Sequence, residues 1–259
     1  MELAEAISNS QNPLTARVMV NRIWQNHFGV GLVTTASNFG QLGDRPSHPE
    51  LLDYLAARFV EQGWSIKAMH REIVLSATYA LSAGSSRENS ATDPENHLLW
   101  RSNRRKLDAE ALRDSLLVVS GKLDLTMGGE AMRLTDEKNC RRTVYGFVSR
   151  AKLDGTLSLF DFPDPNFTSE GRITTDTPLQ RLFFLNSEFV INQAKTFVSR
   201  LETTRGAGAK IRQAYRLLFQ REPAPEEVQA GLKFLESGQD KWTLYAQALM
   251  SSTEFILVN

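Results

Sequence analysis

The stretch that most constrains the fold is residues 12–29, NPLTARVMVNRIWQNHFG. Asn12 can accept hydrogen bonds from the free amides of a first helical turn, and Pro13 has the φ angle of the first helical position. Gly29 is a natural stop. Apolar side chains at helical spacing cover most of the circumference, so we expect a largely buried helix around which the other elements pack.

Three polar residues fall among the apolar side chains of this helix: Arg17, Asn21 and His27. A buried charge or amide costs several kcal/mol unless it is paired. We therefore expect partners elsewhere in the chain and assign Arg17 and Asn21 to a structural polar network. His27 is also a candidate catalytic residue, because a buried histidine can hold a useful proton.

The rest of the pattern predicts a mostly α protein, a multi-helix domain with a small β element of two or three short strands in the middle. Alternation of apolar residues makes residues 141–150 the best strand candidate, with residues 156–162 as its partner. Residues 84–91 resemble a linker. Caps and apolar spacing predict further helices at about residues 2–7, 47–63, 65–79, 94–100, 108–120, 177–201, 210–220, 225–236 and 242–255. The helix at 108–120 should face inward with Ala109, Leu112, Leu116 and Val119, and the segment at 177–201 should be two helices, interrupted at Asn186 and Ser187.

The length of 259 residues permits one large domain or two small ones. We expect one domain over residues 1–259. The alternative is two helical subdomains, about 1–121 and 177–259, joined by a loop and strand region at 122–176.

Composition excludes several functional classes. The chain has 30 basic and 30 acidic residues, so its net charge favours neither nucleic acid nor an anionic membrane. No apolar run approaches the roughly 18 residues that span a bilayer, and the N-terminus lacks the pattern of a signal peptide. The four histidines show no metal-binding spacing, and no haem-attachment motif is present. We expect no metal and no cofactor in this chain.

The first candidate ligand site is the arginine-rich segment at residues 101–108, RSNRRKLD. Arg104 and Arg105 precede a predicted helix whose N-terminus could also attract an anion. The alternative is that these arginines pair with nearby carboxylates such as Asp108, or are simply solvated. If the arginines pair with carboxylates in this way, Asp108 belongs to the structural polar network.

The second candidate is the proline-stiffened segment at residues 160–166, FDFPDPN. Asp161 and Asp164 could act there as acid and base or bind a hard cation, with Asn166 as a ligand-binding residue. The alternative is a rigid corner whose aspartates accept from nearby amides or pair with Arg141 and Arg142. On the first interpretation both arginines bind an anionic ligand.

These groups could form a single site. Buried Arg17 and Asn21 need partners, and the aspartate-rich and arginine-rich segments have the complementary charges. We expect both segments to lie near the first long helix.

Nine segments along the chain have a familiar sequence pattern: NPLTARVMVNRIWQNHFGVGLV, HPELLDYLAARFVEQGWSIKAMHREIVLSATY, DPENHLLWRSNRRKLDAEALRD, LTMGG, RRTVYGFVSR, LFDFPDPN, TPLQRLFFLNSEFV, AYRLLFQREPAPEE and QALMSSTEFILVN. In these segments the chain resembles the planctomycete-type family of domain of unknown function 1553. The resemblance covers essentially the whole chain in the family's order. It implies a C-terminal domain of a large exported bacterial protein, periplasmic or otherwise outside the cytoplasm, with a cytochrome c module often upstream. Haem would then lie in an upstream domain, and the upstream domains would be partners.

The resemblance brings no activity with it. We expect an accessory or ligand-binding and interaction module that serves periplasmic electron transfer or glycan use. The alternative is a hydrolase or lyase acting on an anionic saccharide. In that alternative Asp161 and Asp164 are acid and base, and Arg104, Arg105 and Arg141 hold the substrate's charge.

Overall fold

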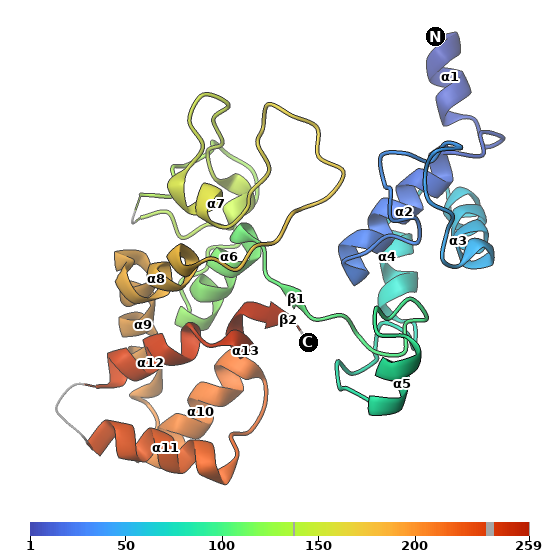
Figure 1. The fold of residues 1–259 in the computed structure, drawn as a ribbon. Helices are drawn as coiled ribbons and strands as arrows, with labels where there is room; N and C mark the ends of the chain where they lie inside the picture. Colours follow the sequence, from blue (N-terminus) through green and yellow to red (C-terminus); the bar gives the residue numbers. More distant parts are fainter. Residues whose placement is uncertain (137, 237–240, 259) are drawn as a thin grey trace. The chain divides into compact units, whose positions relative to one another are not determined.

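The computed structural model describes residues 1–136, 138–236 and 241–258. The chain divides into two compact units, residues 1–105 and residues 106–258. Helices dominate both units, which confirms the predicted mostly α class (Figure 1). Within the described ranges, no helix is both long enough and apolar enough to cross a bilayer.

Unit 1 is built around α2, the helix expected from residues 12–29. The helix starts at Thr15, later than predicted, and Pro13 precedes it. Asn12 still caps the preceding turn, because its Oδ1 accepts from the Leu14 N–H at 2.9 Å. Gly29 ends the helix in the left-handed conformation at φ 84°, as predicted. Unit 1 contains α1 (Glu2–Ser8), α2 (Thr15–Phe28), α3 (Pro49–Glu61), α4 (Ile66–Val74) and α5 (Arg87–Thr92).

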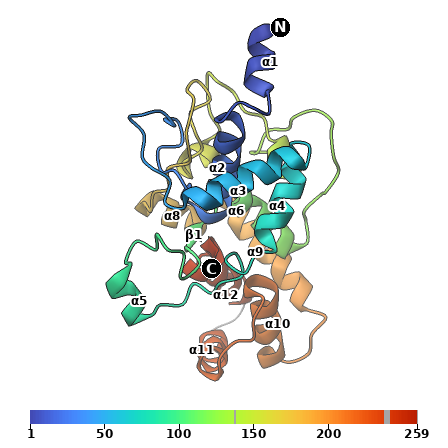
Figure 2. The same ribbon diagram turned by 90° about the vertical axis from the view of Figure 1, so that its right-hand side faces the viewer.

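The core of unit 1 lies where α2, α3 and α4 pack against one another (Figure 2). Trp24 and Phe28 of α2 stack with ring centroids 4.1 Å apart. Leu55 and Phe59 of α3 and Met69 of α4 are buried against them. Each helix thus buries one apolar face, which fixes the positions of the polar residues between those faces.

Two sequence predictions for the end of unit 1 are wrong. The expected linker contains α5, whose N-cap Ser86 accepts from the Asn89 N–H. The expected helix at residues 94–100 is a series of turns, in which Asp93 accepts from the N–H groups of His97 and Leu98. The Ser86 cap favours a helix in the expected linker. The Asp93 bonds take up amides that a regular helix at residues 94–100 would use.

Unit 2 has its core where α9 packs against α6, α8 and α12. The inward positions predicted for α6 are confirmed, because Leu112 and Leu116 are among its buried residues. The predicted break between α8 and α9 is also confirmed, at Ser187, whose backbone is extended. Unit 2 contains α6 (Ala109–Ser120), the 3-10 helix η1 (Thr143–Tyr145), α7 (Gly155–Leu159), α8 (Pro178–Asn186), α9 (Glu188–Leu201), α10 (Ala207–Phe219), α11 (Pro225–Glu236), α12 (Trp242–Met250) and α13 (Thr253–Ile256).

The β element is small, as expected, but lies elsewhere in the sequence. It consists of β1 (Arg105–Lys106) and β2 (Leu257–Val258). The prediction of strands at residues 141–150 and 156–162 is wrong, because η1 and two isolated bridges occupy the first segment and α7 lies in the second. Long loops surround α7 (Figure 1).

The missing strand has a physical explanation. The Thr143 N–H donates to Asp114 Oδ1 at 2.7 Å, and the Arg141 carbonyl accepts from Arg113 Nη1 at 3.0 Å. Both partners lie on α6. Because α6 side chains take these backbone groups, they are not available to a neighbouring strand.

Candidate functional sites

Asn21 is the buried polar centre of unit 1. Its side chain is fully buried, Nδ2 donates to the Val33 carbonyl at 3.0 Å, and Oδ1 accepts from the Val33 N–H at 2.8 Å. Gly31 lies against the same amide, because a Cβ there would come within 2.7 Å of Asn21 Nδ2. Asn21 therefore fixes the chain that leaves α2. Its partner is backbone, and the expectation of an aspartate or arginine partner is wrong.

Arg17 has a more exposed position on the same helix. Its Nε donates to Asp53 Oδ1 at 2.7 Å, and its Nη1 donates to the Pro13 carbonyl at 2.6 Å. Asp53 lies on α3, so the ion pair links the first two long helices. Solvent screens this pair, and we assign it a structural role of small energy.

His27 faces a second histidine. Its Nε2 lies 2.7 Å from Nδ1 of His70, which is on α4, and both rings are half-buried. The Tyr79 ring meets the His27 ring edge-on, with centroids 5.5 Å apart. Burial, followed by the charges of His70 and Arg105, lowers the pKa of His27 from its usual 6.5. The pairing joins residues 43 positions apart, so no local spacing could have predicted it.

The arginine-rich segment separates into residues with different roles. Arg105 Nη1 donates to the Asn26 carbonyl at 2.5 Å, and its stem packs on Gly29, where a Cβ would meet Arg105 Cδ at 2.9 Å. Arg104 is exposed and has no hydrogen bond or ion pair with any described residue. Asp108 caps α6 by accepting from the Ala111 N–H at 2.8 Å.

Asp161 forms the centre of a polar cluster in unit 2. Its carboxylate accepts from the Thr175 N–H at 2.8 Å, from the Thr175 hydroxyl and, at 3.3 Å, from Gln180 Nε2. Gln180 is itself buried, and its Oε1 accepts from Lys106 Nζ at 2.5 Å. Asp161 also holds the left-handed conformation, with φ 59°, which Asp tolerates better than most residues.

The charges in this cluster support one another. Burial would raise the pKa of Asp161, but the bonds from Thr175 and Gln180 and the charge of Lys106 outweigh it and lower the pKa. Burial lowers the pKa of Lys106, while Asp176 and Asp161 partly offset that effect. Asp161 is therefore a stable carboxylate at neutral pH, a poor general acid with its main donors already bound.

Asp164 and Asn166 form a separate turn. Asp164 Oδ1 accepts from the Asn166 N–H at 2.9 Å, and the Asn166 side chain donates to Asp164 and to the Arg150 carbonyl. Asp164 is exposed. This is an Asx turn, in which an Asp side chain replaces a backbone acceptor, so both side chains already stabilise the corner after Pro163.

Arg141 and Arg142 also have internal partners. The two Nη groups of Arg141 donate to the carbonyls of Thr126, Gly128 and Glu130, and its guanidinium stacks on the Tyr145 ring at 4.2 Å. The Arg142 side chain is exposed, and its Nε is a long 4.0 Å from Asp114 Oδ2. Arg141 therefore shapes a loop.

The sequence did not reveal Arg113 as the anchor of that region. It is only 4 % exposed, and its guanidinium donates to the Asn139 carbonyl, the Arg141 carbonyl and Thr143 Oγ1. Burial lowers its pKa, and Asp114 partly offsets this. The one sequence feature that could have revealed Arg113 is its position on the inward face of the helix. In the Asp161 cluster, the sequence did not mark Thr175 or Gln180 in this way.

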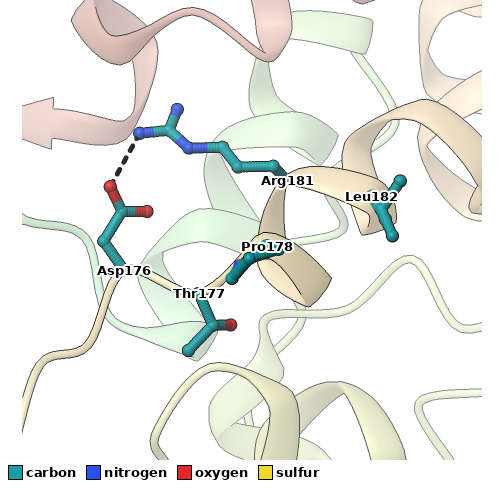
Figure 3. Close-up of a pocket in the computed structure, with 5 residues that line it drawn as sticks. All are labelled: Asp176, Thr177, Pro178, Arg181 and Leu182. Carbon is teal, nitrogen blue, oxygen red and sulfur yellow. Dashed lines mark hydrogen bonds and ion pairs between the residues drawn. The ribbon is translucent and has the colours of Figure 1, made fainter.

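An open depression lies beside the Asp161 cluster on the outer side of α8, with a volume of about 530 Å³ (Figure 3). Asp176 and Arg181 form an ion pair of 3.0 Å across it. The lining residues are Asp176, Thr177, Pro178, Arg181 and Leu182. Within residues 1–136, 138–236 and 241–258, no group of three or more His, Cys, Asp or Glu side chains could hold a metal ion.

The expected single site involves residues of both units. In unit 1, Arg105 and His27 lie near each other, whereas Arg17 and Asn21 bond to other partners. Asp161 is in unit 2 and has donors of its own. The three candidate groups thus have separate local functions in the described residues, and a joint site stays a prediction.

Comparison with known proteins identifies the family. A sequence model of the family described as protein of unknown function (DUF1553), also labelled PSD1, matches residues 1–235. No curated protein and no solved structure matches the chain. Because the match covers well over half of the sequence, the chain belongs to the DUF1553 family.

Proposed function

We propose that this chain is a non-catalytic interaction module that docks a protein partner on the outer face of α8. One observation carries the proposal: Leu179, Leu182 and Leu185 are 65 %, 46 % and 57 % exposed along that helix. They recur at every third position, so they lie on adjacent turns of one side. Three exposed leucines on a single short helix make a larger apolar area than isolated surface leucines do.

The opposite side of α8 strengthens this argument. Phe184 is buried in the core of unit 2, and Phe183 packs against that core. The helix therefore has apolar side chains on both its buried and its exposed side, with Gln180 and Arg181 as polar exceptions, and apolar residues on opposite sides are typical of a helix that is covered all round. The chain covers one side, and a partner would cover the other.

The edge of this face has the composition of an interface rim. Asp176 and Arg181 are 62 % and 45 % exposed and line the depression together with Leu182 (Figure 3). A surface pair of this kind adds little stability to the chain itself. At an interface, such charges set orientation and exclude wrong partners.

The alternative of a saccharide hydrolase or lyase receives less support from the geometry. Asp161 binds its donors internally, and Asp164 belongs to an Asx turn. Arg105 and Arg141 donate to backbone carbonyls. An acid, a base and charge-holding arginines would first have to break these bonds.

The family resemblance provides the biological setting of the proposal. The module would belong to an exported multidomain bacterial protein, and the partner would be an upstream domain of the same polypeptide. The assembly would serve periplasmic electron transfer or glycan use. Any haem would be held by that upstream domain.

Site-specific photocrosslinking tests the docking face. The photoreactive residue p-benzoylphenylalanine replaces Leu182 in the polypeptide translated from the whole gene, and the matched control replaces Leu244, which is 54 % exposed on α12. We expect a crosslink from position 182 to an upstream domain and none from position 244. Equal crosslinking at both positions, none at either, or a crosslink only to residues 1–105 would contradict the proposal.

A thermal-shift screen separates docking from saccharide binding. A ligand at about 100 times its dissociation constant stabilises a fold by about 2.7 kcal/mol, a shift of a few degrees. Under our proposal, sulfated and uronate saccharides cause no shift. A shift that is lost in Arg104→Ala and kept in the control Arg22→Ala, which removes an exposed arginine of α2, would instead support an anion site.

A further inference from the structure

The docking proposal does not involve His27 and His70, whose rings meet in unit 1. The two nitrogens that face each other are 2.7 Å apart, and the ring centroids are 4.9 Å apart at an interplanar angle of 73°. The rings come from α2 and α4, two helices whose packing also buries Met69. The packing of α2 against α4 thus brings two imidazole nitrogens next to each other.

Two imidazoles at this separation can hold a proton or a metal ion between them. Nitrogens that each lie about 2.0 Å from an ion, at a ligand–metal–ligand angle of about 90°, are about 2.8 Å apart. The 2.7 Å distance is within about 0.1 Å of that value. In the metal-free pair the two rings point nearly at each other, because their centroids are 4.9 Å apart and their nitrogens 2.7 Å apart, so both rings must rotate to aim their lone pairs at a common ion.

The surroundings leave the pair accessible. Both histidines are half-buried, and Tyr79 covers one edge of His27 while remaining 38 % exposed itself. Water or an added ligand could therefore reach a metal ion bound by the two histidines and occupy its remaining coordination positions. Arg105 is the charged group near His27, and its repulsion of a cation would weaken binding.

We propose that His27 Nε2 and His70 Nδ1 form a two-imidazole site for a divalent late transition-metal ion, with Cu²⁺ bound more tightly than Zn²⁺. Imidazole suits both ions, and the affinity order of first-row metals places Cu²⁺ highest. Tetragonal Cu²⁺ accepts two neighbouring nitrogens at right angles, which matches the observed separation. The remaining positions of the ion stay open to solvent.

The proton balance of binding is simple. In the metal-free pair, one neutral imidazole donates its N–H to the other ring. Binding moves that proton, through solvent, to the other nitrogen of the same ring. Both lone pairs then face the ion, and two neutral imidazoles bind it without net proton release.

The test is a titration of the whole chain with copper sulfate at neutral pH in a weakly coordinating buffer. Electron paramagnetic resonance should show coupling of one Cu²⁺ to two nitrogens, and calorimetry should give one equivalent. His70→Phe should weaken binding about tenfold or more and leave at most one coupled nitrogen. The matched control, His97→Gln, removes an exposed histidine paired with Glu95 and should change affinity less than about twofold.

Two further measurements keep the test decisive if His70→Phe does not fold. In the unaltered chain, Cu²⁺ should broaden the ring resonances of His27 and His70 before those of His48 and His97. Arg105→Met, which removes the nearby positive charge, should tighten binding. Simultaneous broadening of all four histidines, or no binding, would overturn the proposal and leave the pair as an ordinary hydrogen bond.

Discussion

The two units anchor their loops with buried polar side chains of different kinds. In unit 1, the neutral amide of Asn21 bonds to the backbone of Val33, 12 residues away. In unit 2, the charged Arg113 reaches the carbonyls of Asn139 and Arg141, 26 and 28 residues away. Both side chains are almost completely buried.

The comparison of Asn21 with Arg113 shows that a longer loop needs an anchoring side chain with more hydrogen-bond donors. A short loop can be fixed by one amide that bonds a single residue twice. The region after α6 is longer and has little regular structure, so its carbonyls need a donor with several N–H groups. A guanidinium has five such donors in a rigid fork. Removal of each anchor should therefore have local and unequal consequences.

The largest effect is expected for Arg113→Met. Methionine keeps most of the apolar stem but leaves the buried carbonyl of Asn139 and the partly buried carbonyl of Arg141 without their charged donor. We expect a loss of about 4 kcal/mol in the free energy of unfolding, because each lost bond to a charged donor costs roughly 1.5–3 kcal/mol. Chemical denaturation measures the loss, and hydrogen exchange should quicken in residues 122–136 and 138–146.

The matched control is Arg142→Met, a change to an exposed arginine whose contact with Asp114 is 4.0 Å long. It should cost less than about 1 kcal/mol. Equal losses for the two variants would show that net charge, and not the buried fork of Arg113, governs unit 2. Faster exchange in residues 30–47 of unit 1 would contradict the local character of the anchor.

A smaller effect is expected for Asn21→Leu. Leucine has a similar volume, but it leaves the buried N–H and carbonyl of Val33 unpaired, at about 1–3 kcal/mol for each group. We expect a loss of about 3 kcal/mol and faster exchange confined to residues 30–47. Asn26→Leu, at an exposed position of the same helix, is the control and should stay within about 0.5 kcal/mol of the parent. A loss no larger than that of the control would show that the Val33 groups find other partners.

The sequence predicted the longer helices well because their signals are local. Apolar spacing located α6, and Gly29 marked the end of α2. The strand prediction at residues 141–150 failed because the decisive partners, Arg113 and Asp114, lie on another element. Alternating valines carry no information about which groups will bond to the backbone.

The candidate sites show the same limit. Asp161 stood out in the sequence because prolines and aromatics surround it. Its donors Thr175 and Gln180 follow it by 14 and 19 residues and did not stand out. His70 could be linked to His27 only through the packing of α2 and α4. Residue type revealed which groups need partners, and only the fold identified the partners.

The smallest expected effect concerns Asp161 and tests whether this third polar centre depends on charge as Arg113 does. The pKa of Asp161 is lower in the folded chain than its ordinary 3.8, which it regains on unfolding. The unfolded state therefore binds more protons as the pH falls toward that value. The stabilisation by Asp161 is complete above the ordinary value and is lost as the pH falls through the lowered one.

Asp161→Asn isolates this contribution, because asparagine also tolerates the left-handed backbone at φ 59°. At neutral pH we expect the variant to be less stable by about 1 kcal/mol. The difference should shrink as the pH falls below about 4, measured by urea denaturation of both proteins from about pH 7 to about pH 3, a range that includes the ordinary pKa values of carboxylates. Asp164→Asn, which makes the same change in net charge at the exposed turn, controls for bulk charge. A difference that stays constant with pH would mean that the geometry of the hydrogen bonds from Thr175 and Gln180, and not the charge of Asp161, stabilises this corner. The Asp161 cluster would then resemble the neutral Asn21 anchor of unit 1.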